Sequence, residues 1–197
     1  VSTMIFKKTI FMKNNPQIVA FGASNSKRSI NQQLANFAAQ QIGNAAINLL
    51  DLNDFEMPIY SIDREKETGI PAEALQFKAH LRESDGIIIS FAEHNGAYSV
   101  AFKNIFDWIS RIEKDVWANK PMLLMATSPG GRGGQTVLDI ALNKFKFMNN
   151  NILLSFSLPF FGNNFSKEEG IIDPELNREF REQLDRFKKA ISQTSNV

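Results

Sequence analysis

The sequence predicts an α/β protein with three layers, in which a doubly wound parallel sheet of five strands is covered by helices on both faces. Two observations carry this prediction: five short apolar runs of strand length, and stretches between them in which apolar residues recur every three or four positions. Most runs are apolar at consecutive positions, which is typical of strands buried on both faces. The five runs span residues 17–22, 45–50, 86–91, 121–127 and 152–158.

The stretches between and after the runs have the spacing of amphipathic helices. Four of them place their apolar residues on one clear face, whereas the stretch after Pro71 has a weaker pattern formed by Leu75 and Ala79. The last helix is expected to begin at Asp173 and Pro174, because aspartate caps a helix and proline suits its first turn. The clear stripes are Ile30, Leu34, Phe37, Ala38 and Ile42; Ala101, Ile105, Trp108 and Ile112; Leu138, Leu142 and Phe145; and Phe180, Leu184, Phe187 and Ile191.

The alternation of strands and helices predicts right-handed crossovers and therefore a parallel sheet. Five strands in a chain of this length suit the order 2-1-3-4-5, although composition does not exclude another doubly wound order. Residues 51–70 form an irregular stretch, and long loops in compact domains are usually functional or disordered. We expect a single domain over residues 15–197, preceded by an N-terminal extension of residues 1–14 that is either disordered or not native.

Charge and composition argue against several classes of protein. The chain has 22 basic and 21 acidic residues, and this balance lacks the basic excess expected for binding nucleic acid or a membrane surface. The absence of cysteine excludes disulfides and a cysteine nucleophile, and it favours a cytoplasmic location. The two histidines, His80 and His94, are too few for a histidine metal cluster, so no metal is expected. We find no apolar run near the ~20 residues of a membrane helix and no secretory signal pattern.

The loop after the first run is rich in hydroxyl groups. Ligands of open α/β sheets bind beyond the carboxyl ends of the strands, and the order 2-1-3-4-5 places the loops after strands 1, 3 and 4 there. The first loop contains Ser24, Ser26 and Ser29, followed by Ile30 and Asn31 at the start of a helix. A helix N-terminus attracts phosphate, whereas a simple cap would explain one serine, and the residues alone leave both interpretations open. The P-loop and G-x-G-x-x-G sequences are missing, which favours a monophosphate.

The other two loops also have unusual composition. In the loop after the third run, Asn95 and Gly96 are a turn signal, and Glu93 with His94 is either an acid/base pair or a solvated pair. The loop after the fourth run has four glycines around Arg132, which allow the backbone to approach a flat ligand closely. Its candidate ligand contacts are Ser128, Gly130 and Gly131.

These motifs, taken together and in this order, resemble those of the NAD(P)H-dependent FMN reductase family, whose members have a flavodoxin-like fold and include quinone, azo-dye and chromate reductases. The resemblance spans residues 17–159. The family's phosphate loop has the pattern G-S-x-R-x-x-S-x-N, which falls on residues 23–31, and its ring loop, P-E-Y-N-G-S-Y-P, falls on residues 92–99. The matching pieces are GASNSKRSIN, MPIYSIDREKETGIP, SDGIIISFAEHNGAYSVAFKNIFDWIS and SPGGRGG.

The resemblance implies an enzyme that binds FMN and takes electrons from NADPH or NADH. A hydride would pass to the flavin and then to a quinone, an azo compound, free flavin or a similar small acceptor, with ping-pong kinetics and no catalytic side chain. The site residues that it implies are Ser24, Ser26, Ser29, Ile30 and Asn31 at the FMN phosphate, the backbone of Glu93, His94, Asn95 and Gly96 at the isoalloxazine edge, and Ser128, Gly130 and Gly131 at its other side.

The chain also departs from the family pattern. Ser26 stands where the pattern has arginine, so the phosphate loses a charged partner unless Lys27 or Arg28 compensates. His94 replaces the tyrosine of the ring loop. Family analogy implies a homodimer or a homotetramer. Two alternatives stay open, a non-enzymatic electron carrier of the flavodoxin type and an FMN-binding module, although a carrier typically needs an acidic surface for docking.

Overall fold

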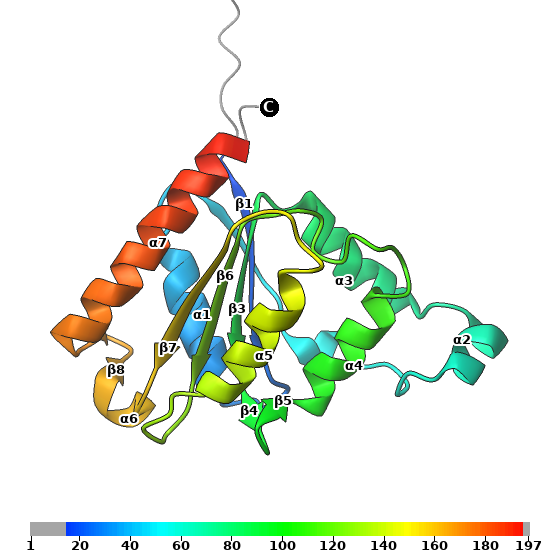
Figure 1. The fold of residues 1–197 in the computed structure, drawn as a ribbon, viewed down its shortest axis with the longest axis horizontal. Helices are drawn as coiled ribbons and strands as arrows, with labels where there is room; N and C mark the ends of the chain where they lie inside the picture. Colours follow the sequence, from blue (N-terminus) through cyan, green and yellow to red (C-terminus); the bar gives the residue numbers. More distant parts are fainter. Residues whose placement is uncertain (1–14, 195–197) are drawn as a thin grey trace, which may run out of the picture.

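The computed structural model describes residues 15–194, and five parallel strands form its central sheet (Figure 1). Their order is β2-β1-β3-β6-β7, which confirms the predicted order of the five runs. The register pairs Ile18 with Gly86 and Ile87 with Met122, so β1, β3 and β6 end close together. The predicted N-terminal extension lies outside the described residues. The strands are β1 (Gln17–Ala23), β2 (Ala46–Leu49), β3 (Gly86–Phe91), β6 (Met122–Thr127) and β7 (Leu153–Leu158).

Helices cover both faces of the sheet, which gives the three predicted layers. Helices α1 and α7 pack against one face, and α3, α4 and α5 pack against the other (Figure 1). The buried residues of the sheet therefore belong to two separate hydrophobic clusters, one on each side. The main helices are α1 (Ile30–Gln40), α3 (Ala72–Glu83), α4 (Val100–Ile109), α5 (Gln135–Phe145) and α7 (Pro174–Thr194).

Short elements complete the connections. The irregular stretch of residues 51–70 contains the 3-10 helix η1 and the helix α2, which projects from the body (Figure 1). None of the helices in the described part of the chain is long and apolar enough to cross a membrane. The short elements are η1 (Leu52–Phe55), α2 (Ile62–Thr68), β4 (Glu93–His94), β5 (Ala97–Tyr98), α6 (Phe161–Asn164), β8 (Phe165–Ser166) and β9 (Gly170–Ile171).

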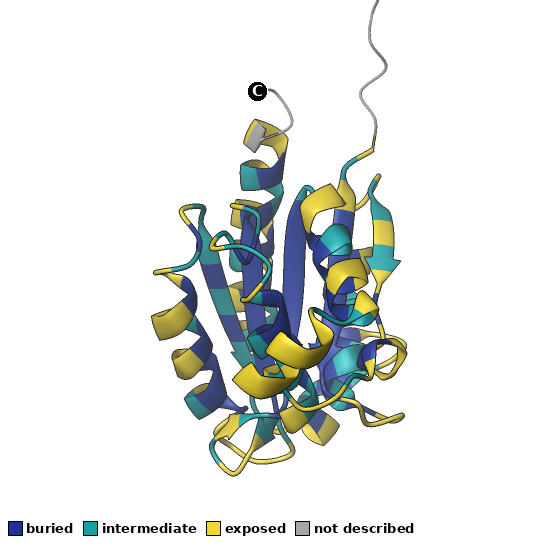
Figure 2. Cartoon of the chain, turned by 90° about the vertical axis from the view of Figure 1, so that its right-hand side faces the viewer, coloured by how far each residue is buried: buried dark blue, intermediate teal, exposed yellow. Residues whose placement is uncertain are grey.

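Burial follows the position of each strand in the sheet (Figure 2). All residues of β3 and β6 are buried, as predicted from their continuous apolar runs. The outer strands differ, because one long side of each lacks a neighbouring strand and coverage by helices is incomplete there. No residue of β2 is buried, and its residues alternate between half-buried and exposed. In β7 every second residue is buried. The prediction of strands buried on both faces is therefore confirmed for the middle of the sheet.

The weak helical pattern after Pro71 gave a wrong buried face for α3. Leu75 is 49% exposed, whereas Phe77 and Lys78 are fully buried. The ring of Phe77 packs edge-on against the rings of Phe21 and Phe55, at centroid distances of 5.3 and 5.0 Å. This aromatic packing turns α3 so that Leu75 faces outward. A sequence pattern that treats every lysine as exposed cannot find this face.

Candidate functional site

The three loops that the sequence analysis places at the ligand-binding edge of the sheet meet at the carboxyl ends of β1, β3 and β6. This edge is the lower one in Figure 1. The loops line a cavity of about 230 Å³ that we call the phosphate cavity. Four of the predicted contacts, Asn95, Gly96, Gly130 and Gly131, do not line it. Its lining residues are Ser24, Ser26, Arg28, Ser29, Ile30, Asn31, Ala92, Glu93, His94, Thr127, Ser128 and Pro129.

The first loop has the hydroxyl groups and free N–H groups that a phosphate needs. Ser29 is the N-cap of α1, and its Oγ accepts a hydrogen bond of 3.1 Å from the N–H of Gln32. The N–H groups of Ile30 and Asn31 have no acceptor among the described residues. Ser29 is therefore a helix cap, as one of the two interpretations predicts, and two donors remain without an acceptor at the positive end of the helix dipole.

The side chain of Asn31 points into the protein and is not available to a ligand. Its Nδ2 donates to the carbonyl oxygen of Thr127 at 3.1 Å, and its Oδ1 accepts from the N–H of Thr127 at 3.1 Å. The same Oδ1 accepts from the hydroxyl of Ser90 at 2.7 Å. Only the backbone of Asn31 is left for the predicted phosphate contact.

The ring loop is a tight hairpin whose acidic residue caps a helix. Asn95 and Gly96 have φ angles of 52° and 75°, as their turn signal predicts. One carboxylate oxygen of Glu93 accepts a hydrogen bond of 3.1 Å from the N–H of Val137, in the first turn of α5. The N-cap of that helix, Gly134, has no side chain to do this. Glu93 thus has a structural partner, which neither predicted interpretation of the Glu93–His94 pair anticipated.

Ser99 joins the ring loop to the first loop, and sequence analysis missed it. Its Oγ donates to the carbonyl of Ala23 at 2.8 Å and accepts from the N–H of Phe102 at 3.2 Å. It therefore caps α4 and fixes the end of β1 at the same time. The available signal was a serine directly before an apolar helical stripe, which is a common N-cap pattern.

The glycine-rich loop is held by the turn that follows β7. The N–H groups of Phe160 and Phe161 donate to the carbonyls of Gly130 and Ser128, both at 3.1 Å. Gly133 is needed for two reasons: its φ is +57°, and an added Cβ would lie 2.4 Å from the Oγ of Ser157. The loop is therefore packed on both sides, not a free flexible turn.

The polar groups around the phosphate cavity indicate binding more than acid/base chemistry. Arg28 is the cation among the lining residues, and the Glu93 carboxylate that lines it is engaged with a helix N-terminus. Burial raises the pKa of Tyr98, whose hydroxyl has no hydrogen-bond partner among the described residues, so this phenol stays protonated. We find no group of metal-ligating side chains in residues 15–194.

A second cavity, of about 300 Å³, adjoins the ring loop through His94 and is lined by most of residues 52–59 and by the start of α4. Asn104 of α4 fixes this segment: its Oδ1 accepts from the N–H of Tyr60 at 2.8 Å, and its Nδ2 donates to the carbonyl of Met57 at 3.1 Å. The indole N–H of Trp108 donates to the carbonyl of Pro58 at 2.7 Å. Trp108 is a core residue, as predicted, and also anchors the long segment.

The donor set of the phosphate cavity fits a phosphate monoester. Three serine hydroxyls and two free N–H groups converge there, and such neutral donors at a helix N-terminus suit a terminal phosphate. The sheet order and the position of this cavity define a flavodoxin-like α/β protein, with a crevice rich in hydrogen-bond donors at the point where the strand order reverses.

Comparison with known proteins gives the family. Residues 16–163 match the model of the NADPH-dependent FMN reductase family, and the chain belongs to this family. It is 31% identical to a quinone reductase of Escherichia coli (strain K12) over 124 residues, which is 62% of this chain and 65% of that protein, less than two thirds of its length. It is 25% identical to a probable NADPH:quinone oxidoreductase 2 of Oryza sativa subsp. japonica, over 85% of both chains.

Solved structures support the fold. The chain superposes on a flavoenzyme NAD(P)H:(acceptor) oxidoreductase from Paracoccus denitrificans with a TM-score of 0.72 and 22% sequence identity, covering 91% of this chain and 98% of that one. At this identity the likeness concerns the fold, and it agrees with the flavodoxin-like sheet described above.

Proposed function

We propose that this protein is an FMN-dependent NAD(P)H oxidoreductase that delivers electrons to a quinone, an azo compound, free flavin or a similar small acceptor. The observation that carries the proposal is the phosphate cavity, where three loops bring hydroxyl and backbone donors together at the switch point of a flavodoxin-like sheet. Family membership and the names of the relatives support FMN and a nicotinamide nucleotide as the ligands.

The residues have distinct roles in this proposal. The hydroxyl groups of Ser24, Ser26 and Ser29 and the N–H groups of Ile30 and Asn31 hold the FMN phosphate. The backbone of residues 93–96 contacts the isoalloxazine edge, and Ser128, Gly130 and Gly131 approach its other side. These contacts orient the cofactor and present backbone N–H groups where negative charge develops.

The chain leaves the redox chemistry to its cofactor. FMN, when bound, supplies a centre that accepts a hydride and gives it up again. The protein binds, orients and shields the reactants, and it contributes no side chain as acid, base or nucleophile. We therefore propose a ping-pong pattern, because donor and acceptor use the same cavity in turn.

The long segment of residues 51–70 is our candidate for a contact between subunits. Ile59, Ile62 and Val100 are 67%, 54% and 71% exposed, although apolar side chains gain from burial. We propose a homodimer or homotetramer that covers them and works in the cytoplasm. Light scattering measures the mass in solution, and a monomer that binds flavin with full affinity would contradict this assembly.

A single preparation tests the function. The purified protein is mixed with FMN, its visible spectrum is recorded, and the oxidation of NADH and of NADPH is followed with benzoquinone, an azo dye and free FMN as acceptors. We expect bound flavin, turnover with at least one acceptor, and parallel double-reciprocal plots. A colourless protein that oxidises neither nucleotide would overturn the proposal.

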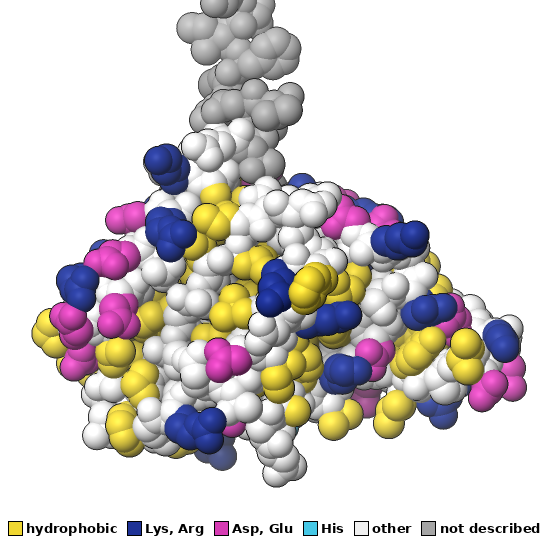
Figure 3. All heavy atoms as spheres, in the orientation of Figure 1, with side chains coloured by type: hydrophobic (Ala, Val, Ile, Leu, Met, Phe, Trp, Pro, Cys, Tyr) yellow, Lys and Arg dark blue, Asp and Glu magenta, His cyan; other side chains and the backbone are white. Residues whose placement is uncertain are grey.

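The electron-carrier alternative predicts a different result in the same experiment. A carrier would bind flavin but would accept electrons only from another protein. Its surface would be strongly acidic, whereas this chain has a net charge of +1, and both signs of charge are interspersed along α7 (Figure 3). Turnover with NADH or NADPH therefore decides between the two.

A further inference from the structure

A third cavity, of about 350 Å³, lies beside the phosphate cavity and is lined by three cationic side chains. It shares Arg28 and Ser29 with the phosphate cavity, so the two are neighbours around the start of α1. Its size is that of a small-ligand site. We call it the basic cavity. Its lining residues are Lys27, Arg28, Ser29, Gln32, Gln33, Asn36, Leu49 and Lys167.

The charges of the basic cavity are not balanced by the protein. Lys27, Arg28 and Lys167 have no ion pair and no side-chain hydrogen bond with any described residue, and no carboxylate is among the lining residues. Like charges brought together repel one another, and an anion between them removes this cost. The basic cavity therefore has the electrostatic character of an anion site.

Lys167 is brought to this cavity by the packing of its hairpin, not by chance extension of a loop. Strands β8 and β9 pair Phe165 with Ile171, and the Oγ of Ser166 accepts from the N–H of Glu169 at 2.9 Å. The ring of Phe165 packs edge-on against that of Phe37 in α1, at a centroid distance of 5.4 Å. The hairpin is thus fixed on the helix whose N-terminus forms the phosphate cavity.

Close contact at Gly170 confirms how tightly the hairpin meets α1. This glycine has a φ of +78°, and an added Cβ would lie 2.3 Å from the ring of Phe37. The neighbouring acids Glu168 and Glu169 are exposed and do not line the cavity. Of the three charged residues in this turn, the lysine is the one that reaches the basic cavity.

We propose that Lys27, Arg28 and Lys167 bind a second phosphate, that of an adenosine phosphate, next to the phosphate of the flavin. The proposal rests on the proposed function for the identity of the first ligand. Two kinds of nucleotide carry this chemistry: FAD, whose ADP half continues from the flavin phosphate, and the nicotinamide nucleotides, which have an adenosine 5′-phosphate and, in NADPH, a further phosphate on the adenosine ribose. Among the lining amides, Gln32 is engaged with Gly22 and Leu50 and the oxygen of Asn36 accepts from Gln40, which leaves the side chain of Gln33 for the sugar or the base.

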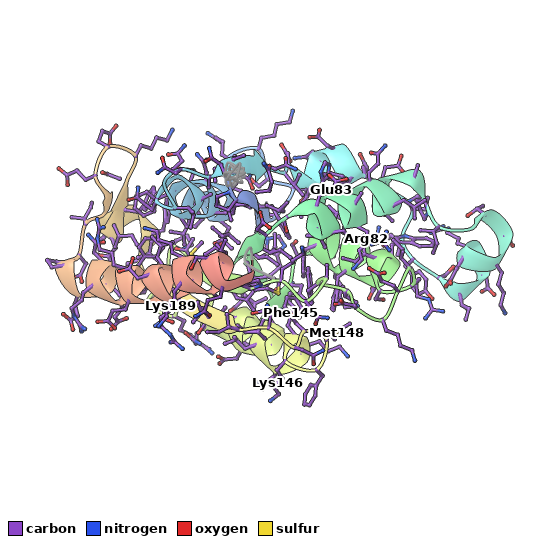
Figure 4. The ribbon with its side chains drawn as sticks, turned by 90° about the horizontal axis from the view of Figure 1, so that it is seen from above. Arg82, Glu83, Phe145, Lys146, Met148 and Lys189 are labelled. Atoms are coloured by element: carbon purple, nitrogen blue, oxygen red, sulfur yellow. The ribbon has the colours of Figure 1, made fainter. Side chains whose placement is uncertain are left out.

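Binding measurements test this subsite without any assay of turnover. Lys167→Gln removes one charge of the basic cavity, and Lys146→Gln is the matched control, since Lys146 is an exposed lysine at the end of α5 (Figure 4). Dissociation constants are measured by calorimetry for FMN, FAD, adenosine 2′,5′-bisphosphate and 5′-AMP. We expect Lys167→Gln to weaken at least one adenosine phosphate about tenfold and FMN less than about twofold, because a charge-assisted contact is lost only at the second phosphate. Lys146→Gln should change none of them.

The pattern of losses identifies the source of the phosphate. A loss for FAD alone assigns the basic cavity to the flavin nucleotide, and a loss for the bisphosphate but not for 5′-AMP or FAD assigns it to the 2′-phosphate of NADPH. A loss for both 5′-AMP and the bisphosphate, but not for FAD, assigns it to the 5′-phosphate that NADH and NADPH share. Unchanged binding of all adenosine phosphates, with FMN still bound, overturns the subsite and leaves the proposed function standing. An equal loss for FMN also overturns it, because Lys167 would then serve the flavin phosphate. If the protein binds no FMN, the proposed function fails, and the bisphosphate still reports on the basic cavity.

Discussion

Asn31 pairs with the backbone of Thr127 in the way that one strand pairs with another. Its amide donates to the Thr127 carbonyl and accepts from the Thr127 N–H, both at 3.1 Å, and both residues are buried. The pair joins the start of α1 to the end of β6, two of the three places from which the phosphate cavity is built. The geometry of the cavity therefore depends on an amide that is hydrogen-bonded within the protein.

Replacing this amide should cost stability and flavin affinity together. In Asn31→Ala both polar groups of the Thr127 backbone lose their partner in a buried place, and we expect the free energy of unfolding to fall by about 3 kcal/mol. Asn143→Ala is the control, since Asn143 is exposed and, among the described residues, accepts only from Lys146. Urea denaturation measures the free energy of unfolding of both variants. Equal effects of the two substitutions would show that the pairing contributes little.

The carboxylate of Glu93 gives a second prediction, about chemistry. Because it accepts from the N–H of Val137, Glu93→Ala should destabilise the protein by about 1 kcal/mol, as loss of a helix cap does. Glu93→Gln keeps an oxygen acceptor and should lose less. If Glu93 acted as an acid or base, the glutamine variant would change the shape of the pH–rate profile. We expect the shape to remain that of the unsubstituted protein, which steady-state kinetics across pH will check.

Ser26 tests the charge balance at the proposed phosphate site. Arginine at this position restores the family pattern and adds a charge-assisted contact, so Ser26→Arg should tighten FMN about tenfold. Riboflavin, which has no phosphate, should bind as before. Asn25→Arg is the control, because Asn25 is exposed and lines the cavity next to the ring loop instead. Quenching of flavin fluorescence gives the affinities. An equal gain for riboflavin would mean that the arginine does not meet the phosphate.

The sheet and the positions of the three loops were predictable because they depend on periodicity and turn chemistry. Apolar runs identify buried strands wherever helices cover both faces, as in β3 and β6. Asn95 and Gly96 form a turn because both tolerate positive φ. These features are local in sequence, so one segment at a time reveals them.

The long-range contacts of individual side chains could not be predicted, because they depend on partners that are distant in sequence. The carboxylate of Glu93 meets α5, and Lys167 approaches α1, only after the chain has folded. Lys78 is the clearest case: sequence patterns place lysine on the surface, yet this side chain is fully buried. Its partners, Glu113 and the carbonyls of Asp115 and Val116, lie on the loop between α4 and β6, distant from Lys78 in sequence.

Lys78 and Glu113 should make stability depend on pH in the acid range. The Nζ of Lys78 lies 2.7 Å from Oε1 of Glu113, and Nη2 of Arg82 lies 2.8 Å from Oε2. Hydrogen bonds from Arg82 and Lys78 lower the pKa of Glu113 to about 2. Because the folded pKa is below the unfolded one, this contribution is complete above the unfolded value of about 4.3 and is lost as the pH falls toward the folded value.

In Glu113→Gln the free energy of unfolding should therefore fall less as the pH is lowered. The substitution should also destabilise the protein near neutral pH, since the buried ammonium of Lys78 keeps only carbonyl partners such as Val116. Glu83→Gln is the control: Glu83 is exposed near Arg82 at the end of α3 (Figure 4), and it has no ion pair with a described residue. Urea denaturation at a series of pH values measures the effect. Parallel curves for the two variants would contradict the assignment.

Gly22 decides how closely α1 approaches β1. A Cβ at this position would lie 2.4 Å from the backbone nitrogen of Gln32 and 2.6 Å from its Cα, and backbone atoms cannot rotate away. Gly22→Ala must therefore push the start of α1 outward, and we expect a loss of about 3 kcal/mol in the free energy of unfolding. The N–H groups of Ile30 and Asn31 move with the helix, so FMN affinity should fall as well. In Gly162→Ala, by contrast, the new methyl group meets no atom of residues 15–194 within 4 Å, and stability should change by less than about 1 kcal/mol. If Gly22→Ala unfolds at the same urea concentration as Gly162→Ala, the close contact between strand and helix does not set the position of the phosphate cavity.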